Sequence, residues 1–154
     1  MTKKRTTHDI GTVLDDIYDA WRAQNLDWLA TYLPHDFSHR INIPPALHPL
    51  GGERQGKPAA LERLGLIFAQ FETKRFNTGQ LTIDDRKATL EVNTLCVHRS
   101  TGVSLDIKKQ HIWTIEDGWP ARLEEYYDVG PVTAFLRSVA PSASAGFPTQ
   151  AAPD

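Results

Sequence analysis

Four β-prone segments in the second half of the chain, separated by short turns, limit the folds that this sequence can adopt. The segments span residues 76–83, 88–99, 103–116 and 122–129. The turns between them contain Asp84-Asp85, Ser100-Thr101-Gly102 and Asp117-Gly118. Turn residues at this spacing join neighbouring strands into hairpins, so the four segments predict an antiparallel meander.

Helical patterns flank the meander. Apolar residues recur at helical spacing from Ile10 to Trp21, with charged residues between them. A shorter helix is expected after Asn25, a third near Pro58, with Phe71 on its inner side, and a last one after Pro131.

A first strand is expected at 37–43, followed by an irregular glycine-rich loop at 46–56. We therefore expect an α+β fold, in which a curled sheet has its helices packed on one face.

Length and charge point to one domain without a polyanionic partner. The chain has 154 residues, 17 Lys+Arg and 19 Asp+Glu, for a formal net charge of -2. This balance argues against a nucleic-acid groove or a membrane surface, both of which require clustered basic residues. We expect a disordered N-terminus at 1–7, one domain at 8–139, and a flexible tail rich in Ala, Pro and Ser at 140–154.

The chain offers few covalent or targeting signals. The single cysteine, Cys96, rules out an intramolecular disulfide and a multi-thiolate zinc site. No apolar stretch approaches the roughly 20 residues of a membrane span, and the N-terminus lacks the apolar core of a signal peptide. A cytoplasmic location without metal or cofactor is therefore expected.

Several motifs resemble the NTF2-like superfamily, and its SnoaL-like branch in particular. Residues 17–21 (IYDAW) and 25–27 (NLD) resemble its first helix and the connector that follows. Residues 113–118 (WTIEDG) and 123–128 (LEEYYD) are similar to its last hairpin. The similarity extends in order over residues 8–139. It implies a cone-shaped half-barrel, in which a curled, mostly antiparallel sheet has helices on its concave face, with a ligand pocket between them and commonly a homodimer.

The resemblance places candidate catalytic residues one position at a time. Asn42 matches the asparagine that holds the attacking water in limonene-epoxide hydrolases, and Glu125 falls where those enzymes place the carboxylate that activates this water. His111 falls near the acid that binds the oxyanion in ketosteroid isomerases. The matches stop there: Val92, Thr94 and Arg40 occupy positions where the hydrolases carry their remaining catalytic residues. No complete catalytic set is present.

Strand alternation groups side chains independently of the resemblance. His111 shares a face with Lys109 and Trp113, and Glu125 shares a face with Tyr127. We expect His111, Glu125 and Asn42 to form the catalytic group, because a histidine beside a buried carboxylate is a general acid–base pair and a nearby amide can stabilise an oxyanion. The residues expected to contact the ligand are Arg40, Tyr18, Trp21, Thr94, His98, Trp113 and Tyr127.

Structural roles compete with these assignments. Glu125 and Arg40 could form a buried ion pair, and His111 could be a satisfied core histidine. For His98, a solvated position at a hairpin end is favoured over a ligand contact. For Cys96 and the tryptophans, ordinary packing is favoured.

Two functions therefore remain open. The first is a cofactor-independent isomerase, cyclase or dehydratase that moves a proton on a small hydrophobic carbonyl compound. The second is a non-catalytic small-molecule binder or dimerisation module. A cavity of a few hundred cubic ångströms and a His111–Glu125 distance of about 3 Å would favour the enzyme. A homodimer is expected through the outer face of the sheet, which is predicted to carry Lys108, Gln110, Glu124 and Tyr126.

Overall fold

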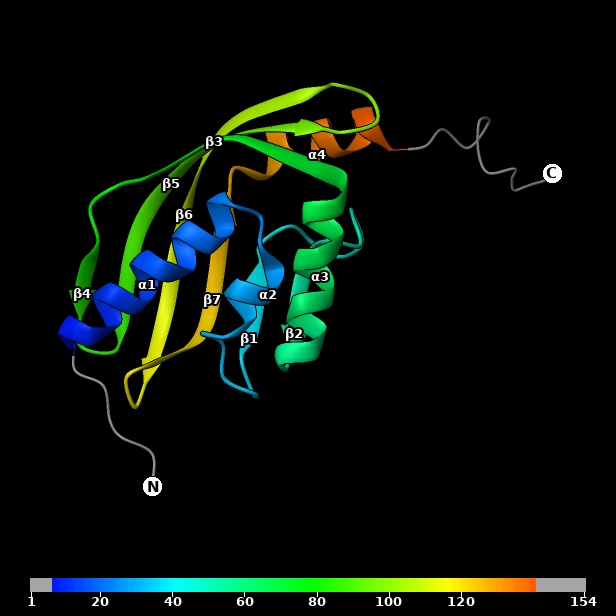
Figure 1. Ribbon diagram of the computed structural model, residues 1–154. Coiled ribbons are helices and arrows are strands. Elements are labelled where there is room, and N and C mark those ends of the chain that lie inside the picture. The colour runs from blue at the N-terminus through cyan, green and yellow to red at the C-terminus, as the bar shows by residue number, and fades with distance from the viewer. Residues whose placement is uncertain (1–6, 141–154) are drawn as a thin grey trace.

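A curled seven-stranded sheet forms one layer, and α1, α2 and α3 cover one of its faces (Figure 1). The computed structural model describes residues 7–140. The elements follow the order α1 (Thr7–Arg22), α2 (Leu26–Ala30), β1 (Ser38–Ile41), β2 (Gly52–Gln55), α3 (Lys57–Gln70), β3 (Phe71–Thr78), β4 (Thr82–Asp84), β5 (Lys87–His98), β6 (Ser104–Glu116), β7 (Trp119–Tyr127) and α4 (Val129–Val139).

The strand order is β2-β1-β7-β6-β5-β3, and β4 pairs with β5 beside β3. β1 runs parallel to β7, and every other pair is antiparallel. The α+β half-barrel and the antiparallel meander are therefore confirmed. The sheet is open, because the strands at its two edges, β2 and β3, are not paired with each other.

Turn chemistry explains the hairpins. Asp117 and Gly118 both have positive φ, 52° and 76°. Two consecutive residues with positive φ are what a type I′ hairpin turn requires, and this turn matches the twist of the flanking strands. Gly102 (φ 76°) occupies the turn between β5 and β6 in the same left-handed region.

Three boundaries differ from the expectation. The segment at 76–83, expected as one strand, is divided between the end of β3 and β4. Phe71 begins β3 instead of ending α3, since its φ of -127° and ψ of 133° are extended. The loop at 46–56 contains the short strand β2, which pairs with β1. Neither the start of β3 nor β2 shows a long apolar alternation, so the local sequence does not predict either one.

Apolar side chains form two clusters. The larger one joins α1, α2 and α3 to the sheet and contains Ile17, Trp21 and Trp113. The smaller one lies under α4 and contains Ile43, Leu50, Phe135 and other residues of the same kind.

No helix within residues 7–140 combines the length and apolarity that a membrane crossing needs. The expected disorder of 1–7 and flexibility of 140–154 fall, apart from Thr7 and Ala140, outside the described residues.

Candidate functional site

Two facing pairs of side chains on β6 and β7 form the centre of the site. Lys109 lies opposite Tyr127, and His111 lies opposite Glu125, in the antiparallel register. Residues that face each other in such a pair share one side of the sheet. The predicted inward rows on these two strands are confirmed: His111 and Glu125 are 0% and 1% exposed.

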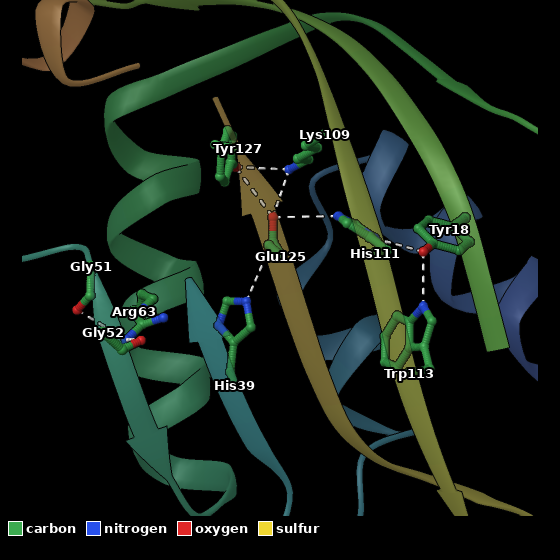
Figure 2. A network of polar contacts seen from close by, with 10 residues as sticks. All are labelled: Tyr18, His39, Gly51, Gly52, Arg63, Lys109, His111, Trp113, Glu125 and Tyr127. Atoms are coloured by element: carbon green, nitrogen blue, oxygen red, sulfur yellow. Dashed lines mark hydrogen bonds and ion pairs between the residues drawn. The ribbon is translucent and has the colours of Figure 1, made fainter. Parts of the chain in front are cut away.

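Glu125 accepts contacts from several donors at once (Figure 2). Lys109 Nζ lies 2.8 Å from Oε1, and the Tyr127 hydroxyl donates to the same oxygen at 3.2 Å. His39 Nε2 lies 2.6 Å from Oε2, and His111 Nε2 lies 3.3 Å from Oε1. Burial alone would raise the pKa of Glu125, but the Lys109 ammonium and the other donors outweigh burial and hold the pKa well below its ordinary value.

A chain of hydrogen bonds through α1 ends at His111, whose Nε2 lies 3.3 Å from Glu125 Oε1 without forming a hydrogen bond of good geometry. Trp113 Nε1 donates to the Tyr18 hydroxyl at 2.9 Å, and that hydroxyl lies 2.7 Å from His111 Nδ1. Burial lowers the pKa of His111 to about 4, so its ring is neutral at pH 7 and carries one hydrogen. Because an ionised carboxylate only accepts, we place that hydrogen on Nε2, which faces Glu125, and Nδ1 accepts from Tyr18.

Lys109 and Tyr127 connect the charged cluster to a cavity. The cavity has a volume of about 100 Å³ and a mostly apolar wall, to which Ile107, Phe76 and Phe135 contribute. It is smaller than the roughly 300–1,000 Å³ typical of ligand pockets. Lys109 and Tyr127 are part of the wall, whereas His111 and Glu125 lie behind them.

The protonation states of these two wall residues follow from their neighbours. Burial would lower the pKa of Lys109, but the charge of Glu125 raises it above its ordinary value. Burial, together with the charge of Glu125, raises the pKa of Tyr127. At neutral pH the cluster therefore contains a carboxylate, an ammonium and a neutral phenol.

The residues expected to contact the ligand divide into two groups. Trp21, Thr94 and Tyr127 line the cavity. Tyr18 and Trp113 are buried in the hydrogen-bond chain and do not belong to the cavity wall. His98 and Arg40 are not part of the wall either.

His98 is 8% exposed, so the favoured solvated position is wrong. Its Nδ1 lies 2.9 Å from Thr101 Oγ1, and its ring packs on Phe71 with centroids 5.3 Å apart.

The predicted face of β1 is wrong. Arg40 is exposed, whereas His39 and Ile41 are buried. Asn42 uses its amide to fasten β1 to β7: Nδ2 donates to the Tyr127 carbonyl at 3.0 Å, and the Tyr127 N–H donates to Oδ1 at 2.8 Å. The Glu125–Arg40 ion pair is also wrong, because Lys109 takes the place expected for Arg40.

His39 and Lys109 are the important residues that sequence reasoning did not select. Phe37, His39, Ile41 and Ile43 alternate with polar residues, and this period-2 pattern could have placed His39 inward. Lys109 was predicted to face inward on β6, but it belongs to no recognised sequence motif and was therefore given no role.

Arg63 on α3 is a second buried cation. It is 1% exposed, and its Nη2 donates to the Gly52 carbonyl at 2.7 Å. Its Nε and Nη1 have no hydrogen-bond partner within the described part of the chain. Burial lowers the pKa of Arg63 to about 10, which leaves it charged at pH 7.

Glycine is required beside this guanidinium. A Cβ at Gly51 would lie 2.0 Å from the Ile43 carbonyl oxygen, so only glycine allows the loop to pass there.

Metal ligands do not cluster in the described residues: they contain no group of three or more His, Cys, Asp or Glu side chains able to hold a metal ion. Cys96 lines the cavity, and burial raises the pKa of its thiol. A raised pKa disfavours the thiolate, so Cys96 has the character of a wall residue.

The fold and site define a class: an α+β half-barrel with ionisable groups at the wall of an apolar cavity. Similar solved structures include an NTF2-like protein of unknown function from Burkholderia pseudomallei, with a TM-score of 0.73 and 16% identity over 86% of this chain and 98% of that one. A proposed isomerase from Rhodopseudomonas palustris has a TM-score of 0.72 and 19% identity over 87% and 99%. A proposed polyketide cyclase from Xanthomonas campestris has a TM-score of 0.68 and 16% identity over 82% and 96%.

The sequence supplies the family. The SnoaL-like domain family matches residues 14–123, and the chain belongs to it. No match was found among curated proteins. At identities this low, the solved structures establish the shared fold alone.

Proposed function

We propose that this chain binds a small hydrophobic carbonyl compound in the cavity and catalyses a proton transfer on it without a cofactor, as an isomerase, cyclase or lyase. The observation that carries the proposal is that Lys109 and Tyr127, at the wall of an apolar cavity, are both hydrogen-bonded to Glu125 behind it. Groups with opposed protonation states beside a cavity are typical of acid–base sites. The assignments of two structural neighbours as an isomerase and a polyketide cyclase point in the same direction.

Each residue has a distinct part in this reaction. Lys109 Nζ donates to the carbonyl oxygen and stabilises the negative charge that develops there. The Tyr127 hydroxyl, 3.2 Å from Glu125 Oε1, gives its own hydrogen to the carboxylate as its oxygen takes the proton from the ligand carbon. The step leaves a neutral phenol, a protonated Glu125 and the enolate of the ligand. His111 and His39 are positioning residues, because they hold Glu125 in place behind the wall.

The low pKa of Glu125 restricts the substrate. A carboxylate with a depressed pKa is a weak base, so it suits an acidic C–H group, such as one that lies between two carbonyl groups. Stabilisation of the enolate by Lys109 lowers the barrier further. The substrate class that fits is therefore a hydrophobic 1,3-dicarbonyl compound.

Hydrogen–deuterium exchange tests the proposal. Ethyl 2-methylacetoacetate is dissolved in D2O with the protein, and the loss of its C2 hydrogen is followed by proton NMR. We expect Glu125→Gln to slow the protein-dependent exchange by about 100-fold or more, the usual contribution of a general base. Glu124→Gln is the matched control, because Glu124 neighbours Glu125 but is not among the buried residues. Exchange no faster than in buffer, or unchanged in Glu125→Gln, would contradict the proposal.

The size of the cavity favours a second candidate, a non-catalytic binder. About 100 Å³ leaves little room for a substrate and its rearrangement, and Glu125 already has four neighbouring donors. Saturable binding of the same ester without faster exchange would support the binder over the enzyme.

A further inference from the structure

The buried charges of the described chain do not balance. Setting histidine aside, the charged side chains that are buried among residues 10–140 are Arg63, Lys109 and Glu125. Glu125 pairs with Lys109 at 2.8 Å, and these two charges compensate each other. The remaining buried charge is the guanidinium of Arg63.

Arg63 has no carboxylate within ion-pair distance in the part of the chain that the structure describes. The oxygens it contacts are the backbone carbonyls of Gly51 and Gly52, and two of its nitrogens stay without a partner. A buried charge without a counter-charge is costly, because the low-dielectric interior replaces its hydration poorly. With histidine set aside, the buried side chains of residues 10–140 therefore carry one more cation than anion, and this imbalance favours an anion near the site. The charges of Glu125 and Glu53 act on Arg63 only from beyond ion-pair distance.

Lys109 offers this anion a place at the cavity wall. Its ammonium has three hydrogens, and two of them are used by Glu125 Oε1 and the Tyr127 hydroxyl, at 2.8 and 2.9 Å. No described residue takes the third. The nitrogen lies 5.6 Å from the centre of the Trp21 ring and 5.0 Å from that of Tyr127, so aromatic faces hold it in position.

We propose that the cavity favours its ligand as an anion: a small hydrophobic molecule with a carboxylate, or the enolate that the proposed proton transfer forms, with one oxygen on Lys109 Nζ. The inference rests on the proposed function for the location of the ligand and adds its charge. The apolar wall accepts the hydrocarbon part of such a molecule, and the third hydrogen of Lys109 accepts its oxygen. Arg63 contributes through its charge and does not touch the ligand, because it lies outside the cavity wall.

Two probes of matched size test the charge of the ligand. Benzoate and benzamide have the same number of non-hydrogen atoms and differ in charge. Their affinities for the full chain are measured by isothermal titration calorimetry at pH 7.5. We expect benzoate to bind about ten-fold more tightly or better, because its carboxylate attracts the Lys109 ammonium by charge, whereas benzamide offers only a neutral carbonyl oxygen.

Variants at Lys109 test the position of the anion. Lys109→Met alone leaves Glu125 buried without its cation, so the double variant Lys109→Met, Glu125→Gln is measured beside it. We expect the double variant to bind benzoate no more tightly than benzamide. Lys108→Met is the matched control, since Lys108 is the exposed neighbour of Lys109, and should keep the preference for benzoate.

Each outcome decides between the proposals. Benzamide binding as tightly as benzoate to the unmodified chain would overturn the anionic ligand and leave the pocket in place. A preference for benzoate that survives in the double variant would overturn the position on Lys109. If neither probe binds, the anionic ligand is overturned, and the exchange experiment with ethyl 2-methylacetoacetate decides the proposed function separately.

Discussion

Glu125 is ionised although it is 1% exposed, because three other side chains supply donors within 3.2 Å. A buried carboxylate in an apolar site usually takes up a proton, and the Lys109 ammonium prevents this. His111 is uncharged instead: it lies beside the same carboxylate, yet burial lowers its pKa and keeps its ring neutral. The contrast arises because Lys109 already compensates the charge of Glu125.

The neutral state of His111 predicts acid sensitivity. Its pKa is about 4 in the folded chain, against an ordinary value of 6.5, so between these pH values the unfolded chain binds a proton that the folded chain does not. Stability contributed by His111 is therefore present above pH 6.5 and is lost as the pH falls towards 4. We expect a loss of about 2 to 3 kcal/mol in the free energy of unfolding between pH 7.5 and 4.5.

Urea denaturation at these two pH values measures the effect. His111→Gln removes the titrating ring but keeps an acceptor and a donor, so its stability should depend much less on pH in this range. An equal loss in the variant would assign the acid sensitivity to other groups.

At the scale of the element, β1 shows how pairing decides which side chains face the interior. β1 runs parallel to β7, with His39 opposite Leu123 and Ile41 opposite Glu125. Because Leu123 and Glu125 face inward, their partners on β1 do so as well. Arg40 then turns to the outer face.

Two substitutions on β1 should have different effects on stability. Arg40→Ala removes an exposed side chain, and we expect a change within about 0.5 kcal/mol in the free energy of unfolding. Asn42→Ala removes both hydrogen bonds to the Tyr127 backbone and should cost about 1 to 3 kcal/mol. Chemical denaturation of the two variants compares them, and a larger cost for Arg40→Ala would contradict the observed face of β1.

At the scale of the whole molecule, the sheet has a covered face and an open one. The helices α1, α2 and α3 lie on the face that holds the site (Figure 1). On β6, Lys108 and Gln110 alternate with Lys109 and His111 and are exposed. This outer face is available to a second copy of the chain.

We propose a homodimer through this outer face, with Lys108, Gln110, Glu124 and Tyr126 at the contact. Equilibrium sedimentation at micromolar concentration should give twice the 17.3 kDa mass of one chain. Gln110→Arg places a further cation beside Lys108 and should shift the equilibrium towards monomer, because like charges repel across a two-fold contact. A monomeric mass for the unmodified chain would remove the dimer.

Local patterns in the sequence were sufficient for α1, the meander, and the inward rows of β6 and β7. These depend on periodicity and turn residues within a short stretch, such as Asp117-Gly118, and the chain obeys them independently of its other parts. The pairing of His111 with Glu125 followed from two such rows joined by one hairpin.

Only the tertiary structure decided the partners of Glu125 and the burial of Arg63. His39 and Glu125 are 86 positions apart in the sequence and come together because β1 pairs in parallel with β7. No hairpin turn joins these two strands, so the local sequence does not predict the pairing. Arg63 is buried because α3 packs against the loop at Gly51 and Gly52, and its helical position alone does not indicate a charge inside the fold. Which charge compensates which depends on distances across the folded interior, and local sequence carries no measure of them.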